Sequence, residues 1–149
     1  MILNILALTI ATFASMAGPL APEQSRVLAQ EQFSLQKRYA NAWVNDVFKD
    51  NILLTLSRMD GSVDTPVTKP RTFALSLSPG ELFAFHEDVL DQYKGKPIKT
   101  MKSHFNYSDG FKSSGYLYGD GICHLASLLY RAAKNAGLDA YAPTNHDFA

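Results

Sequence analysis

The feature that most constrains this chain is a glycine turn followed directly by a helix-forming run. Gly119 and Gly121 flank Asp120, and glycine is the residue that adopts positive φ and allows close backbone approach. Gly137 suits the position just past a helix end. Between the turn and Gly137, apolar residues recur at the helical steps of three and four: Ile122, Leu125, Ala126, Leu128, Leu129, Ala132, Ala133 and Ala136. The pattern predicts a tight turn and a largely buried helix over 122–136.

The only cysteine of the chain, Cys123, falls in the first turn of that helix. Free amide N–H groups and the positive end of the helix dipole favour a thiolate there. His146 follows 23 residues later, after a predicted short strand over 139–142 that leads back toward it. A thiol at a helix start with a histidine on a following strand is the general arrangement of papain-like and transglutaminase-like enzymes. We therefore predict Cys123 as nucleophile and His146 as general base and acid.

Other residues around the turn are candidates for the same site. The predicted oxyanion-binding or site-lining residues are Gly121, His124, Asp120 and Tyr118. A backbone N–H near Gly121, or a neutral His124, would donate a hydrogen bond to an oxyanion. Asp120 and Asp147 are the local candidates to orient the imidazole of His146. The alternative is a buried cysteine that only packs, because free cysteine is among the most buried residue types.

These motifs resemble the VanW family. Its members carry a Gly-Gly-Gly-x-Cys-Gln motif entering a helix, an Ala-Gly-Leu turn and a terminal His-Ser, which Gly119–His124, Ala136–Leu138 and His146 approach. Pro79–Phe85 is similar to its Pro-Gly-Glu-x-Phe-Ser-Phe segment, and Asn51-Ile52 to an earlier Asn-Ile. The likeness covers about the last hundred residues in the same order. The sequence departs from the family motifs at five positions. Asp120 stands in place of a glycine, His124 of a glutamine, Ala84 of a serine, His86 of an asparagine and Asp147 of a serine.

The resemblance implies a role in the cell envelope, because the VanW family is associated with vancomycin resistance and so with peptidoglycan. The implied activity is thiol-dependent acyl transfer or hydrolysis, with an amide of peptidoglycan or its stem peptides as substrate. The family's last segment would lie beyond Ala149, so we expect a C-terminal truncation. The alternative function is a non-catalytic cell-wall-binding module with a buried structural cysteine.

The first residues predict export. Residues 1–17 are apolar and end in Ser15-Met16-Ala17, whose small residues suit cleavage of a signal peptide. The segment carries no Lys or Arg, so an uncleaved anchor and a buried N-terminal helix remain alternatives. Residues 18–22 form a predicted linker. We expect an extracytoplasmic protein that touches the membrane only through the N-terminal segment, if that segment is not cleaved.

Composition limits the remaining options. The chain has 149 residues, which suit one domain over 23–149. Its formal net charge is zero and its basic residues are scattered, so we expect no nucleic-acid partner. One cysteine cannot form an internal disulfide. Cys123 and His124 are adjacent and no Cys-x-x-Cys or His-x-x-x-His spacing occurs, so we expect neither a metal nor a cofactor.

Periodicity predicts an α+β fold. An amphipathic stripe predicts a helix from about Pro22 to Phe48: Leu28, Leu35, Tyr39, Trp43 and Val47. The run 51–56 fits either a helix or a strand, and the resemblance favours a helix. Alternation predicts strands over 72–77, 82–85 and 99–107. We therefore expect a small antiparallel sheet with a buried helix that carries Cys123 at its N-terminus, papain- or transglutaminase-like in general arrangement.

Overall fold

The computed structural model describes residues 5–12, 26–35, 39–62, 71–86, 91–96, 98–101, 103–115 and 118–142. These residues form an α+β fold, as predicted. Two short 3₁₀ turns lie at Asp91–Tyr93 and Tyr107–Asp109. The other elements, in chain order, are β1 (Ile5–Thr12), β2 (Arg26–Ser34), α1 (Ala42–Asp60), β3 (Arg71–Leu77), β4 (Leu82–Ala84), β5 (Ile98–Thr100) and α2 (Ile122–Asn135).

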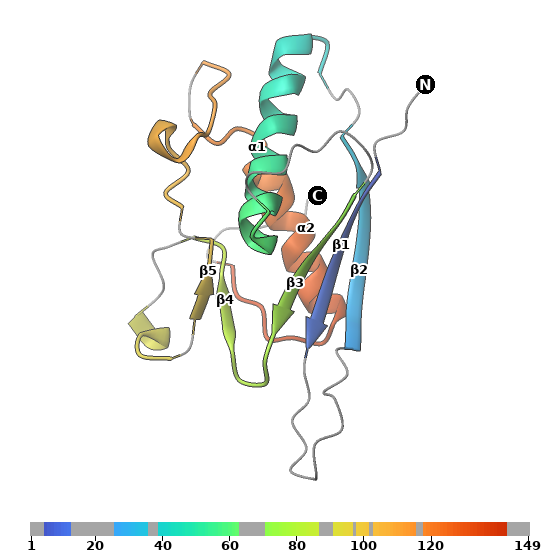
Figure 1. Cartoon of the computed structure of the whole chain (residues 1–149), viewed down its shortest axis with the longest axis vertical. Helices are drawn as coiled ribbons and strands as arrows, with labels where there is room; N and C mark the ends of the chain where they lie inside the picture. The colour runs from blue at the N-terminus through green and yellow to red at the C-terminus, as the bar shows by residue number, and fades with distance from the viewer. Residues whose placement is uncertain are drawn as a thin grey trace.

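The main sheet is mixed. Its strand order is β2-β1-β3, with β1 antiparallel to β2 and parallel to β3 (Figure 1). A separate pair, β4 and β5, is parallel. The predicted antiparallel sheet is therefore wrong for β1–β3 and for β4–β5. The reason is connectivity: the chain passes through β2 and α1 before β3, and parallel pairing needs such a long crossover connection.

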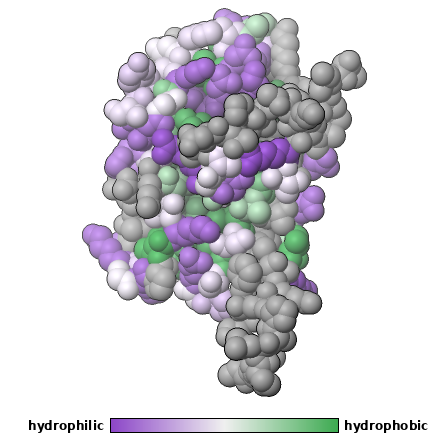
Figure 2. Space-filling model, in the orientation of Figure 1, coloured by the Kyte–Doolittle hydropathy of each residue, from purple (hydrophilic) through white to green (hydrophobic). Residues whose placement is uncertain are grey.

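Both helices cover one face of this sheet. α1 packs against β3, α2 packs against β2, and the helices contact each other. Along β3 every second side chain is buried, Phe73, Leu75 and Leu77, whereas Thr72 and Ala74 are exposed. The core combines these with helix residues and Met101: Ile52, Leu56, Met59, Leu125 and Leu129. Figure 2 shows mainly hydrophilic side chains over the upper part of the molecule, and patches of hydrophobic side chains between hydrophilic ones lower down.

The helix predicted from Pro22 to Phe48 is wrong over the described residues 26–35 and 39–41. Residues 26–34 are strand β2, which pairs with β1 along its whole length. Helix α1 begins only at Ala42, where the side chain of Asn41 accepts a hydrogen bond from the Trp43 amide at 2.9 Å. Asparagine is among the best N-cap residues, so this cap fixes the helix start. The pairing of β2 with β1 before residue 35, and the cap at Asn41 after it, outweigh the helical spacing of the apolar stripe.

Most other predicted elements are confirmed. The run 51–56 is helical, within α1, and the predicted strands over 72–77 and 82–85 correspond to β3 and β4. The turn before β4 is type II, with Gly80 at φ 78° and the Glu81 amide bonded to the Ser78 carbonyl at 2.9 Å.

The two other predicted strands are wrong. Within the predicted strand 99–107, strand β5 ends at Thr100. Further along, Phe105 adopts φ 55°, which a strand residue does not, and a 3₁₀ turn begins at Tyr107. Residues 139–142 form no strand. Instead the end of α2 closes on itself: Gly137 has φ 73°, its amide bonds to the Lys134 carbonyl, and the Leu138 amide bonds to the Ala133 carbonyl. This is a Schellman cap, in agreement with the predicted role of Gly137.

Candidate functional site

The turn before α2 requires both of its glycines. Gly119 and Gly121 have φ values of 85° and 94°. A Cβ on Gly121 would lie 3.0 Å from the Cα of Phe48, and one on Gly119 would lie 2.6 Å from Cδ1 of Ile122. The predicted tight turn with close backbone approach is confirmed, and the partner of that approach is helix α1.

Cys123 is the second residue of α2, directly after the N-cap residue Gly121 and Ile122. Its side chain is exposed, so the alternative of a buried, purely packing cysteine is wrong. The reason is helical geometry, because Ile122 and Leu125 take the buried positions of this turn and Cys123 lies off that face. The Cys123 carbonyl accepts a hydrogen bond from the Ser127 hydroxyl at 3.0 Å.

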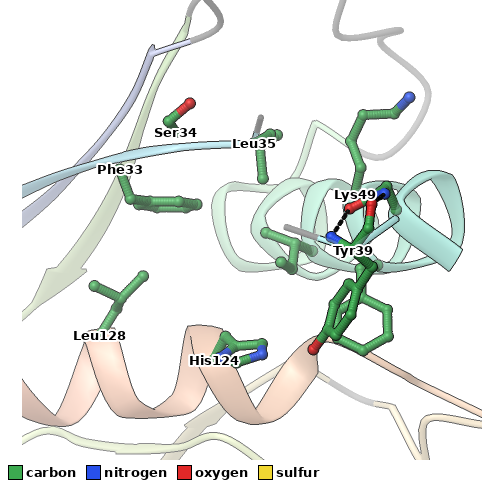
Figure 3. Close-up of a pocket in the computed structure, with 10 residues that line it drawn as sticks. Phe33, Ser34, Leu35, Tyr39, Lys49, His124 and Leu128 are labelled. Atoms are coloured by element: carbon green, nitrogen blue, oxygen red, sulfur yellow. Dashed lines mark hydrogen bonds between the residues drawn. The ribbon is translucent and has the colours of Figure 1, made fainter. Parts of the chain in front are cut away.

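His124 faces a small pocket between β2, α1 and α2 (Figure 3). Its ring centroid lies 5.9 Å from that of Phe48, and Phe33, Lys49 and Leu128 also line the pocket. The pocket measures about 30 Å³, which is space for one or two water molecules but not for a peptide. Neighbouring residues on a helix point about 100° apart, so His124 and the exposed Cys123 serve different surfaces.

Two other predicted site residues, Asp120 and Tyr118, contact the loop before the turn in different ways. The Asp120 carboxylate accepts a hydrogen bond from the Ser114 amide at 2.6 Å. Tyr118 pairs with Ser113 in an isolated β-bridge. Tyr118 is 51% exposed and Tyr107 76% exposed, and their rings lie edge-on with 6.1 Å between centroids. Asp120 therefore orders the loop, whereas Tyr118 belongs to an exposed aromatic pair.

His146 and Asp147 lie outside the described residues, so the pairing of Cys123 with His146 stays a prediction. His86 is half-buried and His104 is exposed, and their ring centroids lie 6.1 Å apart. Within the described residues, no three His, Cys, Asp or Glu side chains are grouped to hold a metal ion.

No family model, curated protein or solved structure matches the chain. The VanW resemblance therefore rests on the sequence motifs alone. Among the described residues, neither helix combines the length and hydropathy needed to cross a membrane.

Two carboxylates near the candidate site have shifted pKa values. Asp109 accepts a hydrogen bond from the His104 amide at 2.7 Å, and this bond is the main reason that its pKa is lowered. Asp46 accepts a hydrogen bond from Lys49 at 2.8 Å, which lowers the pKa of Asp46 and raises that of Lys49. These pKa shifts favour the charged form of Asp109, on the loop before the turn, and the charged forms of Asp46 and Lys49, beside the pocket.

Sequence reasoning missed the role of Asn51. Its side chain is 1% exposed on α1 and bonds to the backbone of Lys112 and Asp120. The available signal was an amide at the head of the apolar run 51–56, a place where a polar group needs partners. Spacing alone does not identify those partners.

Proposed function

We propose that this chain is a VanW-like protein of the cell envelope whose Cys123 thiol attacks an amide in a peptidoglycan-type peptide. The observation that carries the proposal is the exposed thiol in the first turn of α2. A nucleophile that acts on a polymer must be open to solvent, and the free amides of a first helical turn suit a developing negative charge. The motif resemblance to the VanW family supplies the substrate class.

The proposed chemistry is acyl transfer through a thioester. The Cys123 thiolate attacks the amide carbonyl carbon, and the carbon–nitrogen bond breaks as His146 gives its proton to the leaving amine. Water then attacks the thioester in a hydrolase, or a second amine does so in a transferase, and the thiol is regenerated. Backbone N–H groups at Gly121 and Cys123 would stabilise the oxyanion.

Purified full-length protein incubated with peptidoglycan fragments tests this proposal. We expect mass spectrometry to show cleaved or exchanged amides with the wild-type protein. Cys123→Ala should abolish the product, and His146→Ala should lower its rate by about 10²-fold or more. His104→Ala is the matched control, because His104 is an exposed histidine outside the proposed pair. Full activity in the Cys123→Ala variant would refute the thiol mechanism.

Export is part of the proposal and has its own test. Ile5–Thr12 is strand β1, so cleavage after Ala17 would remove the middle strand of the main sheet. The envelope protein therefore either keeps its N-terminus or has a different sheet. N-terminal sequencing of protein from the envelope fraction distinguishes these forms, and protein found only in the cytosol would refute export.

The exposed pair Tyr107 and Tyr118 favours a second candidate, a non-catalytic module that binds cell-wall polymer. Aromatic rings with polar tips are common at binding surfaces because they bury area and still make hydrogen bonds. For this function, Cys123→Ala should bind insoluble peptidoglycan as the wild type does, whereas the double change Tyr107→Ala and Tyr118→Ala should weaken sedimentation with it. Unchanged binding of the double variant would refute this candidate.

A further inference from the structure

The side chain of Asn51 is a polar group in an otherwise unfavourable place. It is 1% exposed within α1, beside the core residues Ile52 and Leu56. A buried amide destabilises a fold unless its donors and acceptor are hydrogen-bonded. The retention of an amide here therefore calls for a specific set of partners.

Those partners are backbone groups of two segments far along the chain. Nδ2 of Asn51 donates to the carbonyl of Lys112 at 3.0 Å and to the carbonyl of Asp120 at 2.9 Å. Its Oδ1 accepts from the Lys112 amide at 2.9 Å. Both N–H donors and the oxygen are used, so the amide fits this site through all of its polar atoms.

The same hydrogen bonds fix the position of the turn at Gly119–Gly121, which lies directly before the helix that carries Cys123. Asp120 stands between the two positive-φ glycines, and the Gly119 amide bonds to the Lys112 carbonyl at 3.0 Å. Phe48, one helical turn before Asn51 on α1, lies against Gly121. α1 thus holds the turn by packing at one residue and by hydrogen bonds at the next turn, and α2 starts directly after it.

We propose that Asn51 is a positioning residue that sets the orientation of the turn and thereby of the Cys123 thiol. This inference rests on the proposed role of Cys123 as nucleophile. Asn51 does not touch the substrate in this scheme. It acts through the backbone of Lys112 and Asp120.

The test is the rate at which iodoacetamide alkylates Cys123, measured against pH in the full-length protein. We expect the native wild type to react about tenfold or more faster than the same chain unfolded in urea. In Asn51→Asp, a carboxylate without N–H donors faces two carbonyl oxygens, so the turn should shift and this advantage should be lost. Thr55→Val is the matched control, because Thr55 is a fully buried polar residue on the same helix whose hydroxyl donates to the Asn51 carbonyl.

The outcomes separate the two proposals. A wild-type pH profile in a folded Asn51→Asp variant overturns the positioning role and leaves the thiol proposal standing. An equal change in Thr55→Val at the same loss of Tm also overturns it, because the effect is then general destabilisation. A native wild-type rate no faster than the unfolded rate overturns the thiol proposal, and Asn51 then positions no reactive thiol. Should Asn51→Asp fail to fold, Asn51→Gln keeps the amide on a longer side chain and takes its place with the same expected loss.

Discussion

Gly121 and Gly137 both adopt positive φ, but their surroundings differ. A Cβ on Gly121 would press on the backbone of Phe48 at 3.0 Å, whereas one on Gly137 would meet nothing within 4 Å. Alanine at either position adds left-handed strain of about 1–2 kcal/mol. The effect of alanine on the unfolded chain is the same at both positions. The two glycines therefore form a matched pair in which only the close approach differs.

We predict that Gly121→Ala lowers the free energy of unfolding by about 1–3 kcal/mol more than Gly137→Ala does, because the added methyl group overpacks the contact with α1. Urea denaturation of both variants measures the difference. Equal losses would mean that the contact between the turn and Phe48 is not tight in solution.

Asp109 links stability to acid pH. Hydrogen bonds from the His104 amide, then from the Ser103 hydroxyl, together with the nearby charge of Arg58, hold its pKa below the ordinary value. Its ionised form therefore stabilises the fold above the ordinary aspartate pKa of about 3.9. That contribution is lost as the pH falls from there through the lowered folded-state pKa.

We predict that Asp109→Asn lowers Tm at pH 7 and that the difference from wild type shrinks as the pH falls below about 4. Thermal unfolding followed by circular dichroism, from about pH 2.5 to pH 7, measures both effects. Asp46→Asn is a second test of the same kind of linkage, because the pKa of Asp46 is also lowered, mainly by its hydrogen bond from Lys49 on α1. A Tm difference that does not change with pH would rule out the linkage.

At the residue scale, local chemistry was predictable and long-range partners were not. The glycines of the turn follow from a local pattern, Gly-x-Gly before a helical run, and Gly137 follows from the end of that run. Asn51 meets its partners 61 and 69 residues further along the chain. No spacing rule connects such positions, so the residue that anchors the turn could not be read from sequence.

At the element scale, the periodicity was most misleading over the described residues 26–35 and 39–41, where it predicted a helix. Leu28 and Leu35 are seven positions apart, which places them on one side of a helix but on opposite sides of a strand. The choice depended on whether β1 was available as a partner, which is tertiary information. The strand β3 was easier, because its alternation matches a half-buried strand that needs no knowledge of its neighbours.

The place of β2 beside α2 can be tested through an ion pair. Glu31 on β2 bonds to Arg131 on α2 at 3.1 Å and to Asn135 at 3.1 Å. We predict a coupling energy of about 0.2–1 kcal/mol in a double-mutant cycle of Glu31→Ala and Arg131→Ala, the usual range for a partly exposed pair. Urea denaturation of the four proteins gives this energy. A helix over residues 22–48 would remove this register, and additive effects would count against β2.

At the scale of the whole molecule, β1 holds the main sheet together. β2 and β3 do not pair with each other in the strand order β2-β1-β3, and each bonds to β1. We predict that a chain starting at Gly18 loses about 3 kcal/mol or more of unfolding free energy, which lowers Tm by about 10 °C for a domain of this size. Thermal unfolding of residues 18–149 and 1–149 compares them directly. Equal Tm values would favour removal of the first 17 residues in the mature protein.

The contact of Asn51 with Asp120 also has a consequence for biosynthesis. The amide leaves the ribosome 69 residues ahead of the carbonyl that it binds. At a synthesis rate of about 5–20 residues per second, roughly 3–14 seconds pass between the synthesis of Asn51 and that of Asp120. During that interval the nascent helix exposes an unsatisfied amide beside apolar side chains, a surface that chaperones bind. The turn at Gly119–Gly121 can dock on α1 only after Asp120 has been made, so a ribosome-bound chain stalled before Asp120 should still lack this contact.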